Sequence, residues 1–181
     1  MAANSVENGT YENSTLGFHY TPPTGMRDTT SAGQEEIRKR AEARHTAKTL
    51  DLLLAMASGP DDTAPDWHAM AIETYPRTAW SNLNDFQAAA KMNVAVAGSR
   101  ASAVGQTQRL TFSEQNFAVS RFELREGAIV KKAVVYTTVR QGKVLSFAFS
   151  GNSPQQVQAM TGSMKTLVFS KATPEGSQDR N

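Results

Sequence analysis

Residues 128–149 read AIVKKAVVYTTVRQGKVLSFAF, and this stretch decides the fold. Its two halves, Ala128–Arg140 and Lys143–Phe149, are rich in β-branched and aromatic residues, which favour strands. Between them lies Gln141–Gly142, a two-residue connection of the kind that closes a tight hairpin. The pattern predicts an antiparallel β-hairpin.

The second strand of this hairpin has two different faces. Leu145, Phe147 and Phe149 share one face, and the small Ser146 and Ala148 share the other, because successive side chains of a strand point to opposite sides of the sheet. We therefore expect the first face to pack into a deep core. The second face suits a close, flat neighbour such as a helix.

A helix is predicted directly after the hairpin. Ser153 is a favourable N-cap, Pro154 suits the first helical position, and Gln156 completes a capping box. The apolar stripe of this helix consists of Val157, Met160, Met164, Leu167 and Val168. Hairpin and helix together predict an antiparallel sheet with a helix folded back on it.

The rest of the chain supplies further elements. Apolar runs and alternations predict strands at Tyr11–Tyr20, Thr49–Ala57, Trp67–Tyr75, Arg109–Ser113 and Asn116–Leu124. Periodicity alone does not separate strand from helix at Thr49–Ala57, but its shortness and the loop that follows favour a strand. A charged surface helix is expected at Gln34–Ala47, and Ser99–Gln108 is interpreted as a loop of small residues.

A second internal helix is predicted at Leu83–Ala97. Ser81 or Asn82 can cap its start, and Gly98 suits the position after its end. Its expected apolar face consists of Leu83, Phe86, Ala90, Val94 and Ala97.

These elements predict class α+β: an antiparallel sheet of about six strands with helices packed on its faces, an α/β/α sandwich. A chain of 181 residues with 39% hydrophobic residues fits a single domain with a real core. Residues 1–10 are small and polar, and residues 171–181 contain no large apolar side chain. We therefore expect both ends to be disordered and residues 11–170 to form the domain.

Composition and charge exclude several classes of protein. The chain has 19 basic and 17 acidic residues, a balance that argues against a nucleic-acid partner. It has no cysteine, which excludes disulfides and thiolate metal sites. No run approaches the ~20 apolar residues of a membrane span, and the first residues lack the features of a signal peptide. We expect a soluble cytoplasmic protein; the alternative is an exported or periplasmic mature domain with a new initiator methionine.

The sequence shows no catalytic motif, so we expect no catalytic residue, no cofactor and no metal. Its histidines, His19, His45 and His68, stand far apart and at no metal-ligand spacing from one another or from a carboxylate. No G-x-S-x-G nucleophile elbow is present. The best candidate for acid–base chemistry is His68 with the nearby Asp66, although a histidine at a strand end that faces water is the preferred interpretation.

Four residues are candidates for contact with a ligand or a partner. These are Trp67, His68, Tyr75 and Trp80. Aromatic residues that flank a loop often line a binding cleft. A place in the core or at its rim explains the same residues equally well.

Both ends of the presumed domain resemble the PsbP-like family. Residues 11–26, YENSTLGFHYTPPTGM, resemble its opening, in which an aromatic-rich strand runs into a Pro–Gly turn. The stretch Arg140–Phe147, followed by Ser153 and a helix that closes on Leu167–Phe169, is similar to its ending. The resemblance implies an α/β/α sandwich over residues 11–170. Photosystem-associated subunits, a Ran-binding nuclear import factor and uncharacterised bacterial secreted proteins or lipoproteins share that fold.

The resemblance also implies a non-enzymatic domain that docks an unknown protein partner, because known members act mainly by docking. The competing hypothesis is a small hydrolase or ligand-binding enzyme with a site near His68, Asp66 and Trp67. A purely structural domain in an envelope assembly is the third hypothesis. Since fold does not fix function, the choice among them depends on the site.

Overall fold

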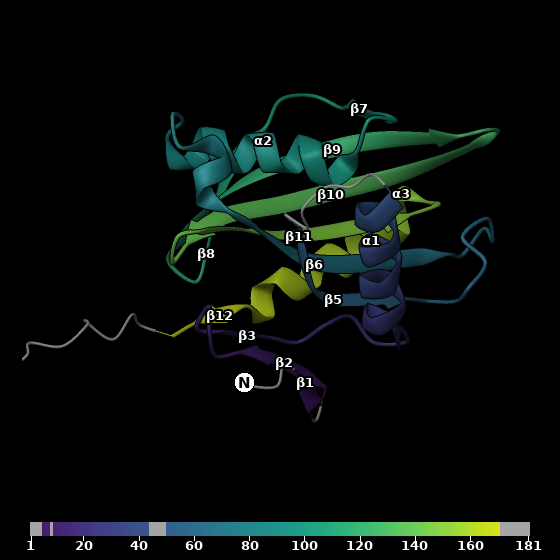
Figure 1. Ribbon diagram of the computed structural model, residues 1–181. Coiled ribbons are helices and arrows are strands. Elements are labelled where there is room, and N and C mark those ends of the chain that lie inside the picture. The colour runs from purple at the N-terminus through teal and green to yellow at the C-terminus, as the bar shows by residue number, and fades with distance from the viewer. Residues whose placement is uncertain (1–4, 8, 44–49, 171–181) are drawn as a thin grey trace, which may run out of the picture.

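The computed structural model describes residues 5–7, 9–43 and 50–170. In these ranges the chain forms one large and one small antiparallel sheet together with three α-helices (Figure 1). The strands are β1 Ser5–Glu7, β2 Thr10–Asn13, β3 Phe18–Tyr20, β4 Arg27–Asp28, β5 Asp51–Ala57, β6 His68–Pro76, β7 Ala101–Ala103, β8 Gln108–Phe112, β9 Gln115–Glu126, β10 Ile129–Arg140, β11 Lys143–Gly151 and β12 Val168–Phe169. The helices are α1 Thr30–Ala43, α2 Asp85–Ala97 and α3 Pro154–Thr161, with 3₁₀ helices at Arg77–Trp80 and Gly162–Thr166.

The large sheet has eight strands in the order β4-β5-β6-β11-β10-β9-β7, and β8 also pairs with β9. The predicted hairpin is its centre. Strands β10 and β11 pair from Lys132 opposite Gly151 to Arg140 opposite Lys143. Gln141 and Gly142 both have positive φ, 48° and 71°, as a tight hairpin turn requires.

The two faces of the large sheet are covered differently, as the hairpin predicted. On one face, α3 and the small sheet β1-β2-β3-β12 bury the core around Phe147, which is fully inaccessible to solvent. On the other face, α2 lies across β9, β10 and β11 (Figure 1). The small Ser146, which alternates with Phe147 along β11, is fully buried. Helix α1 packs against β5. The α+β class and the antiparallel sandwich are therefore confirmed.

The closing helix is confirmed in its start and in most of its stripe. Ser153 caps α3 with a complete capping box to Gln156. The buried members of the stripe are Val157, Met160, Met164 and Leu167. Val168 is 43% exposed because the helix gives way to a 3₁₀ helix after Thr161, and Val168 belongs to β12 instead.

The predicted apolar face of the second internal helix is wrong in part: Ala97 packs against the core, but the fully buried residues are different ones. The residues of α2 that the structure buries are Ala88, Ala89, Met92 and Asn93, whereas Val94 is 57% exposed. Small side chains let the helix lie close to the sheet, and the buried amide of Asn93 bonds to β9. The cap is Asn84 rather than Ser81 or Asn82, because its side chain accepts a hydrogen bond from the backbone of Gln87.

Other boundaries also differ from the prediction. The strand predicted at Tyr11–Tyr20 is divided into β2 and β3, which pair with each other in the small sheet. Strand β1 lies within the N-terminal stretch expected to be disordered, and β7 lies within the predicted loop Ser99–Gln108. The predicted tail 171–181 and the predicted last residues of the first helix, 44–47, lie outside the described residues.

Candidate functional site

The residues predicted for a binding site lie at opposite ends of β6. Trp67 and His68 are at its start, and Tyr75 and Trp80 are at or beyond its end. At about 3.3 Å per residue, His68 and Tyr75 are roughly 23 Å apart along the strand. The structure therefore brings these four residues together in two pairs rather than around one cleft.

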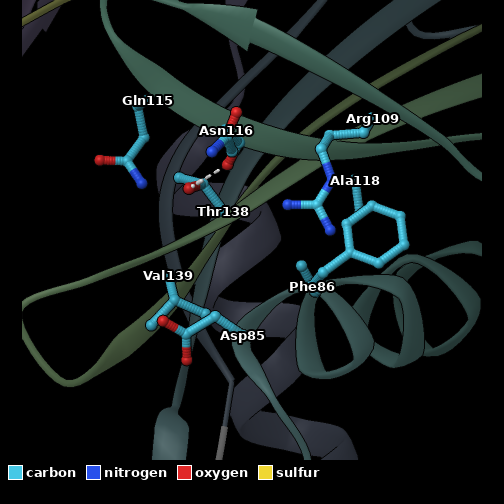
Figure 2. Close-up of a pocket in the computed structure, with 9 residues that line it drawn as sticks. Asp85, Phe86, Arg109, Gln115, Asn116, Ala118, Thr138 and Val139 are labelled. Carbon is cyan, nitrogen blue, oxygen red and sulfur yellow. Dashed lines mark hydrogen bonds between the residues drawn. The ribbon is translucent and has the colours of Figure 1, made fainter.

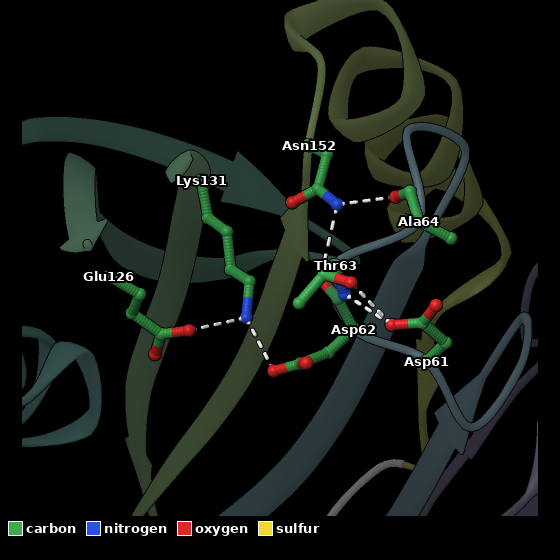
Figure 3. Close-up of polar contacts among 7 residues, drawn as sticks. All are labelled: Asp61, Asp62, Thr63, Ala64, Glu126, Lys131 and Asn152. Carbon is green, nitrogen blue, oxygen red and sulfur yellow. Dashed lines mark hydrogen bonds and ion pairs between the residues drawn. The ribbon is translucent and has the colours of Figure 1, made fainter. Parts of the chain in front are cut away.

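At the start of β6, Trp67 covers a buried cation, Lys131 of β10. The side chain of Lys131 is only 7% exposed, and its Nζ donates to Asp62 Oδ2 and Glu126 Oε2, both at 2.7 Å (Figure 3). The same Nζ lies 4.8 Å from the centroid of a Trp67 ring. Burial lowers the pKa of Lys131, but the two carboxylates outweigh burial and raise it overall. Trp67 thus has a structural role.

The loop before Trp67 is tied to the sheet by the same cluster. Asn152 Nδ2 donates to the carbonyl oxygens of Asp62 and Ala64, at 3.1 and 2.5 Å (Figure 3). The Asp61 carboxylate accepts from the backbone and the hydroxyl of Thr63, and these two bonds lower its pKa. No group of three potential metal-ligating side chains occurs in the ranges that the structure describes.

His68 and Asp66 make contact through the backbone. His68 Nδ1 lies 2.8 Å from the carbonyl oxygen of Asp66, so it must donate its proton there. The backbone N–H of His68 donates to Ser58 Oγ at 3.0 Å. This arrangement orients the imidazole but gives it no carboxylate partner of the kind that the acid–base hypothesis invoked.

At the other end of β6, Tyr75 and Trp80 pack on each other with ring centroids 5.9 Å apart. Arg77 holds the following turn, because its guanidinium donates to the carbonyl oxygens of Trp80 and Leu83 and to Asp85 Oδ1. Burial raises the pKa of Tyr75 above its ordinary value. These aromatic residues support the connection into α2.

A cavity of about 140 Å³ lies close by, between the start of α2 and strands β8, β9 and β10 (Figure 2). It is lined by Asp85, Phe86, Ala89, Arg109, Gln115, Asn116, Ala118, Thr138 and Val139. Its lining combines apolar side chains with amide, hydroxyl, carboxylate and guanidinium groups. This mixture is typical of sites that bind through a few oriented polar contacts.

Arg109 is the distinctive group of the cavity. Its guanidinium carbon lies 4.3 Å from the centroid of the Phe86 ring, a cation–π contact that fixes its position. Across the described ranges, its N–H groups make no hydrogen bond and no ion pair. The carboxylate that shares the cavity, Asp85, accepts instead from Arg77 Nε at 3.1 Å. Arg109 therefore presents uncompensated positive charge.

Local geometry explains how Arg109 reaches this place. Ser113 and Glu114 have φ of 48° and 62°, so β8 and β9 are joined by a tight turn. That turn sets Arg109 opposite Ala118, on the face that α2 covers. The small Ala118 leaves room for the guanidinium to reach Phe86 on α2. Sequence reasoning predicted the strand but not this role, because Phe86 is distant in sequence and no motif links the two residues.

No family model and no curated protein sequence matches the chain. Among solved structures, the fold is similar to that of the cyanobacterial PsbP protein CyanoP from Synechocystis sp. PCC 6803, with a TM-score of 0.57 and 11% identity, over 94% of this chain and 98% of that one. LpqN of Mycobacterium tuberculosis, a protein involved in cell envelope biogenesis, gives a TM-score of 0.46 and 8% identity, over 85% of this chain and 83% of LpqN. The chain has a PsbP-like fold. Within the described ranges, none of its helices has the length and apolar character of a membrane span.

Proposed function

We propose that this chain is a non-enzymatic accessory domain that docks a protein partner at the cavity between α2 and the β8–β9 hairpin. The observation that carries the proposal is Arg109, a guanidinium held over Phe86 without any described carboxylate partner. Arginine and aromatic residues supply a large share of the energetic centres of protein interfaces. A guanidinium already held in place also loses less conformational entropy when a partner binds.

The surroundings of Arg109 support a protein partner. Strand β8 follows the cavity along the edge of the sheet, and its first four residues are exposed. Leu110, a large apolar residue whose side chain lies on the other face of the same strand, is 39% exposed. A cavity of about 140 Å³ is below the usual ~300–1,000 Å³ of a small-molecule site, but it is large enough for one side chain of a docked protein.

The alternative is a hydrolase or ligand-binding enzyme centred on His68, Asp66 and Trp67. It has less support, because the imidazole bonds to a carbonyl and the indole covers Lys131. The two functions make opposite predictions for the double variant His68→Ala with Asp66→Ala. A docking domain keeps its partner, whereas an enzyme at that site loses turnover.

Site-directed cross-linking tests the proposal. A photoreactive benzoylphenylalanine is placed at the exposed Leu110 of β8, the residue next to Arg109 on the strand that borders the cavity, or, as the control, at Val168 of β12, which is 43% exposed. The protein is irradiated in cells of its own species, and cross-linked products are identified by mass spectrometry. We expect one protein to be captured from position 110 but not from position 168. Equal capture at both positions, or none at position 110, contradicts docking at this cavity.

A further inference from the structure

Strand β8 is an open edge of the large sheet. It pairs with β9 alone among the described strands, so the backbone groups along its other side are not used by a neighbouring strand. With five residues it is longer than the other two edge strands, β4 with two and β7 with three. An exposed edge strand is a template for an extended segment of another chain.

Two arginine side chains lie near β8, one on each face of the sheet. Arg109 points to the face covered by α2, where it lines the cavity (Figure 2). Arg121 of β9 reaches the start of β8, where its Nη1 donates to Gln108 Oε1 at 3.2 Å. Neither guanidinium has an ion pair with a carboxylate in the described part of the chain. A segment along β8 therefore meets Arg109 on one face, whereas Arg121 adds positive charge only near the start of β8, on the other face.

The geometry of a β-sheet determines what such a segment must carry. Side chains of an added strand alternate between the two faces, and directly opposite pairs have Cβ atoms about 4.5–5.5 Å apart. A carboxylate at the position beside Arg109 is within reach of the guanidinium. Arginine binds carboxylates through paired N–H donors, which is stronger than a neutral hydrogen bond.

We propose that β8 accepts an extended acidic segment of the partner protein, and that a glutamate or aspartate side chain of this segment binds Arg109 at the mouth of the cavity. This inference rests on the proposed docking function and adds the chemistry and conformation of the docked segment. Asp85, the acidic group of the cavity, does not repel the incoming carboxylate strongly, because it already forms an ion pair with Arg77. Gln115 lines the same cavity with an amide that makes no described hydrogen bond, and supplies a second donor.

Selection from a random peptide library tests the charge. A phage-displayed library of 12-residue peptides is selected on the wild-type protein, on Arg109→Leu and on the matched control Arg27→Leu. Arg27 lies on β4, the opposite edge of the sheet; it is also exposed, and its guanidinium has no partner among the residues that the structure describes. We expect the wild type and Arg27→Leu to enrich acidic peptides and Arg109→Leu to lose that enrichment. The inference is overturned if peptides selected on the wild type contain acidic residues no more often than the starting library does. It is also overturned if Arg109→Leu enriches acidic peptides as strongly as the wild type.

A synthetic copy of the best peptide tests the contact and the conformation. Replacing its key Glu by Gln should weaken binding about tenfold on the wild type and less than about twofold on Arg109→Leu. Two series of peptides are then methylated, one at the odd-numbered and one at the even-numbered backbone nitrogens. Methylation should abolish binding in one series and leave it unchanged in the other, because only every second N–H of an added strand faces β8. Uniform tolerance of methylation overturns the strand geometry. If amidation of the peptide C-terminus abolishes binding, the group that binds Arg109 is the terminal carboxylate and not a side-chain carboxylate, which overturns the inference.

Two further outcomes separate the inference from its premise. If the protein self-associates and acidic peptides disrupt this self-association, the occupant of the β8 edge is a second copy of this chain. That result also overturns the inference. The cross-linking experiment at position 110 is repeated in the variant Arg109→Gln. If this variant captures the partner with the same yield as the wild type, the docking function stands, but the proposed contact between Arg109 and an acidic side chain is overturned. Absence of capture at position 110 contradicts the docking function itself.

Discussion

Lys131 shows how one buried charge organises a whole loop. Its side chain is only 7% exposed, whereas the side chains of its partners Asp62 and Glu126 are 54% and 41% exposed. We expect either carboxylate alone to compensate most of the charge of the cation. Removal of both leaves a buried charge without a partner, which is strongly unfavourable.

We therefore predict that Asp62→Asn and Glu126→Gln each lower the free energy of unfolding by about 1 kcal/mol, and that the double variant loses more than the sum, roughly 3 kcal/mol or more. Denaturant unfolding measures all three variants. Glu35→Gln, which breaks ion pairs on the exposed face of α1, serves as the control and should leave stability nearly unchanged. Strict additivity of the two losses would show that Lys131 is not desolvated in solution.

Glu73 makes stability depend on pH between about 4.5 and 7. It lies on β6 between Leu52 of β5 and Ser146 of β11, where burial raises its pKa to about 7. The folded state therefore keeps its proton up to about pH 7, whereas the unfolded chain releases it near 4.5. Between these values the folded state binds more protons, so the free energy of unfolding falls as pH rises and is level above about 7.

Glu73→Gln should remove this fall. We predict that the variant matches the wild type near pH 4 and is more stable at pH 8 by about 2 kcal/mol, since a pKa unit corresponds to about 1.4 kcal/mol and the side chain is only half-buried. Unfolding free energies from pH 4 to pH 8 provide the measurement. Glu114→Gln, on an exposed turn, is the matched control. Parallel pH profiles for Glu73→Gln and the wild type contradict the prediction.

The residue scale is where sequence reasoning was least informative. The sequence makes Trp67 and Trp80 candidates for ligand contact, because aromatic residues often bind ligands; in the structure Trp67 packs over Lys131 and Trp80 packs against Tyr75. Arg109 was not singled out, because its character comes from Phe86, Asp85 and Arg77, which converge only after folding. Electrostatic isolation of a side chain depends on distances across elements, and local sequence does not encode them.

At the scale of elements, agreement followed the strength of the local signals. The β10–β11 hairpin and the capped start of α3 each combine turn or cap residues with a clear apolar pattern, and both are confirmed. Helix α2 lacks such a pattern. It is rich in alanine and carries apolar residues on several sides, so the small residues that allow close approach to the sheet, rather than the largest ones, determine its buried face.

This difference gives a direct test of the face of α2. Asn93 is fully buried, and its Nδ2 donates to the carbonyl oxygen of Ala118 and to Ser120 Oγ. We predict that Asn93→Ala lowers the free energy of unfolding by about 2 kcal/mol through lost hydrogen bonds and packing. Val94→Ala, one residue away and on the exposed side, should change it by less than about 0.5 kcal/mol. Thermal or denaturant unfolding measures both, and the reverse order would restore the face predicted from sequence.

At the scale of the whole molecule, the sequence predicted the class of the fold but not its division into two sheets. The opening strand β3 pairs with β2 on one side and, on the other, with β12 from the far end of the chain, through Val168 opposite His19 and Phe169 opposite Phe18. A strand of two or three residues has little pattern of its own. Whether such a strand forms depends on partners that are distant in sequence. The same partners determine which sheet it joins.

The small sheet nevertheless belongs to the same cooperative unit as the large one. The Phe18 ring of β3 packs against Phe147 at the centre of the large sheet and against Phe169 of β12, with centroids 5.8 and 5.9 Å apart. We predict that Phe18→Ala lowers the free energy of unfolding by about 3–5 kcal/mol, as does Phe147→Ala, because each leaves a cavity in one shared core. Native-state hydrogen exchange is the decisive measurement: the amides of β10 and β11 should lose protection by the same amount in Phe18→Ala as those of β3. If only β3 loses protection, the small sheet unfolds by itself, and the N-terminal strands form a separate subdomain of the fold.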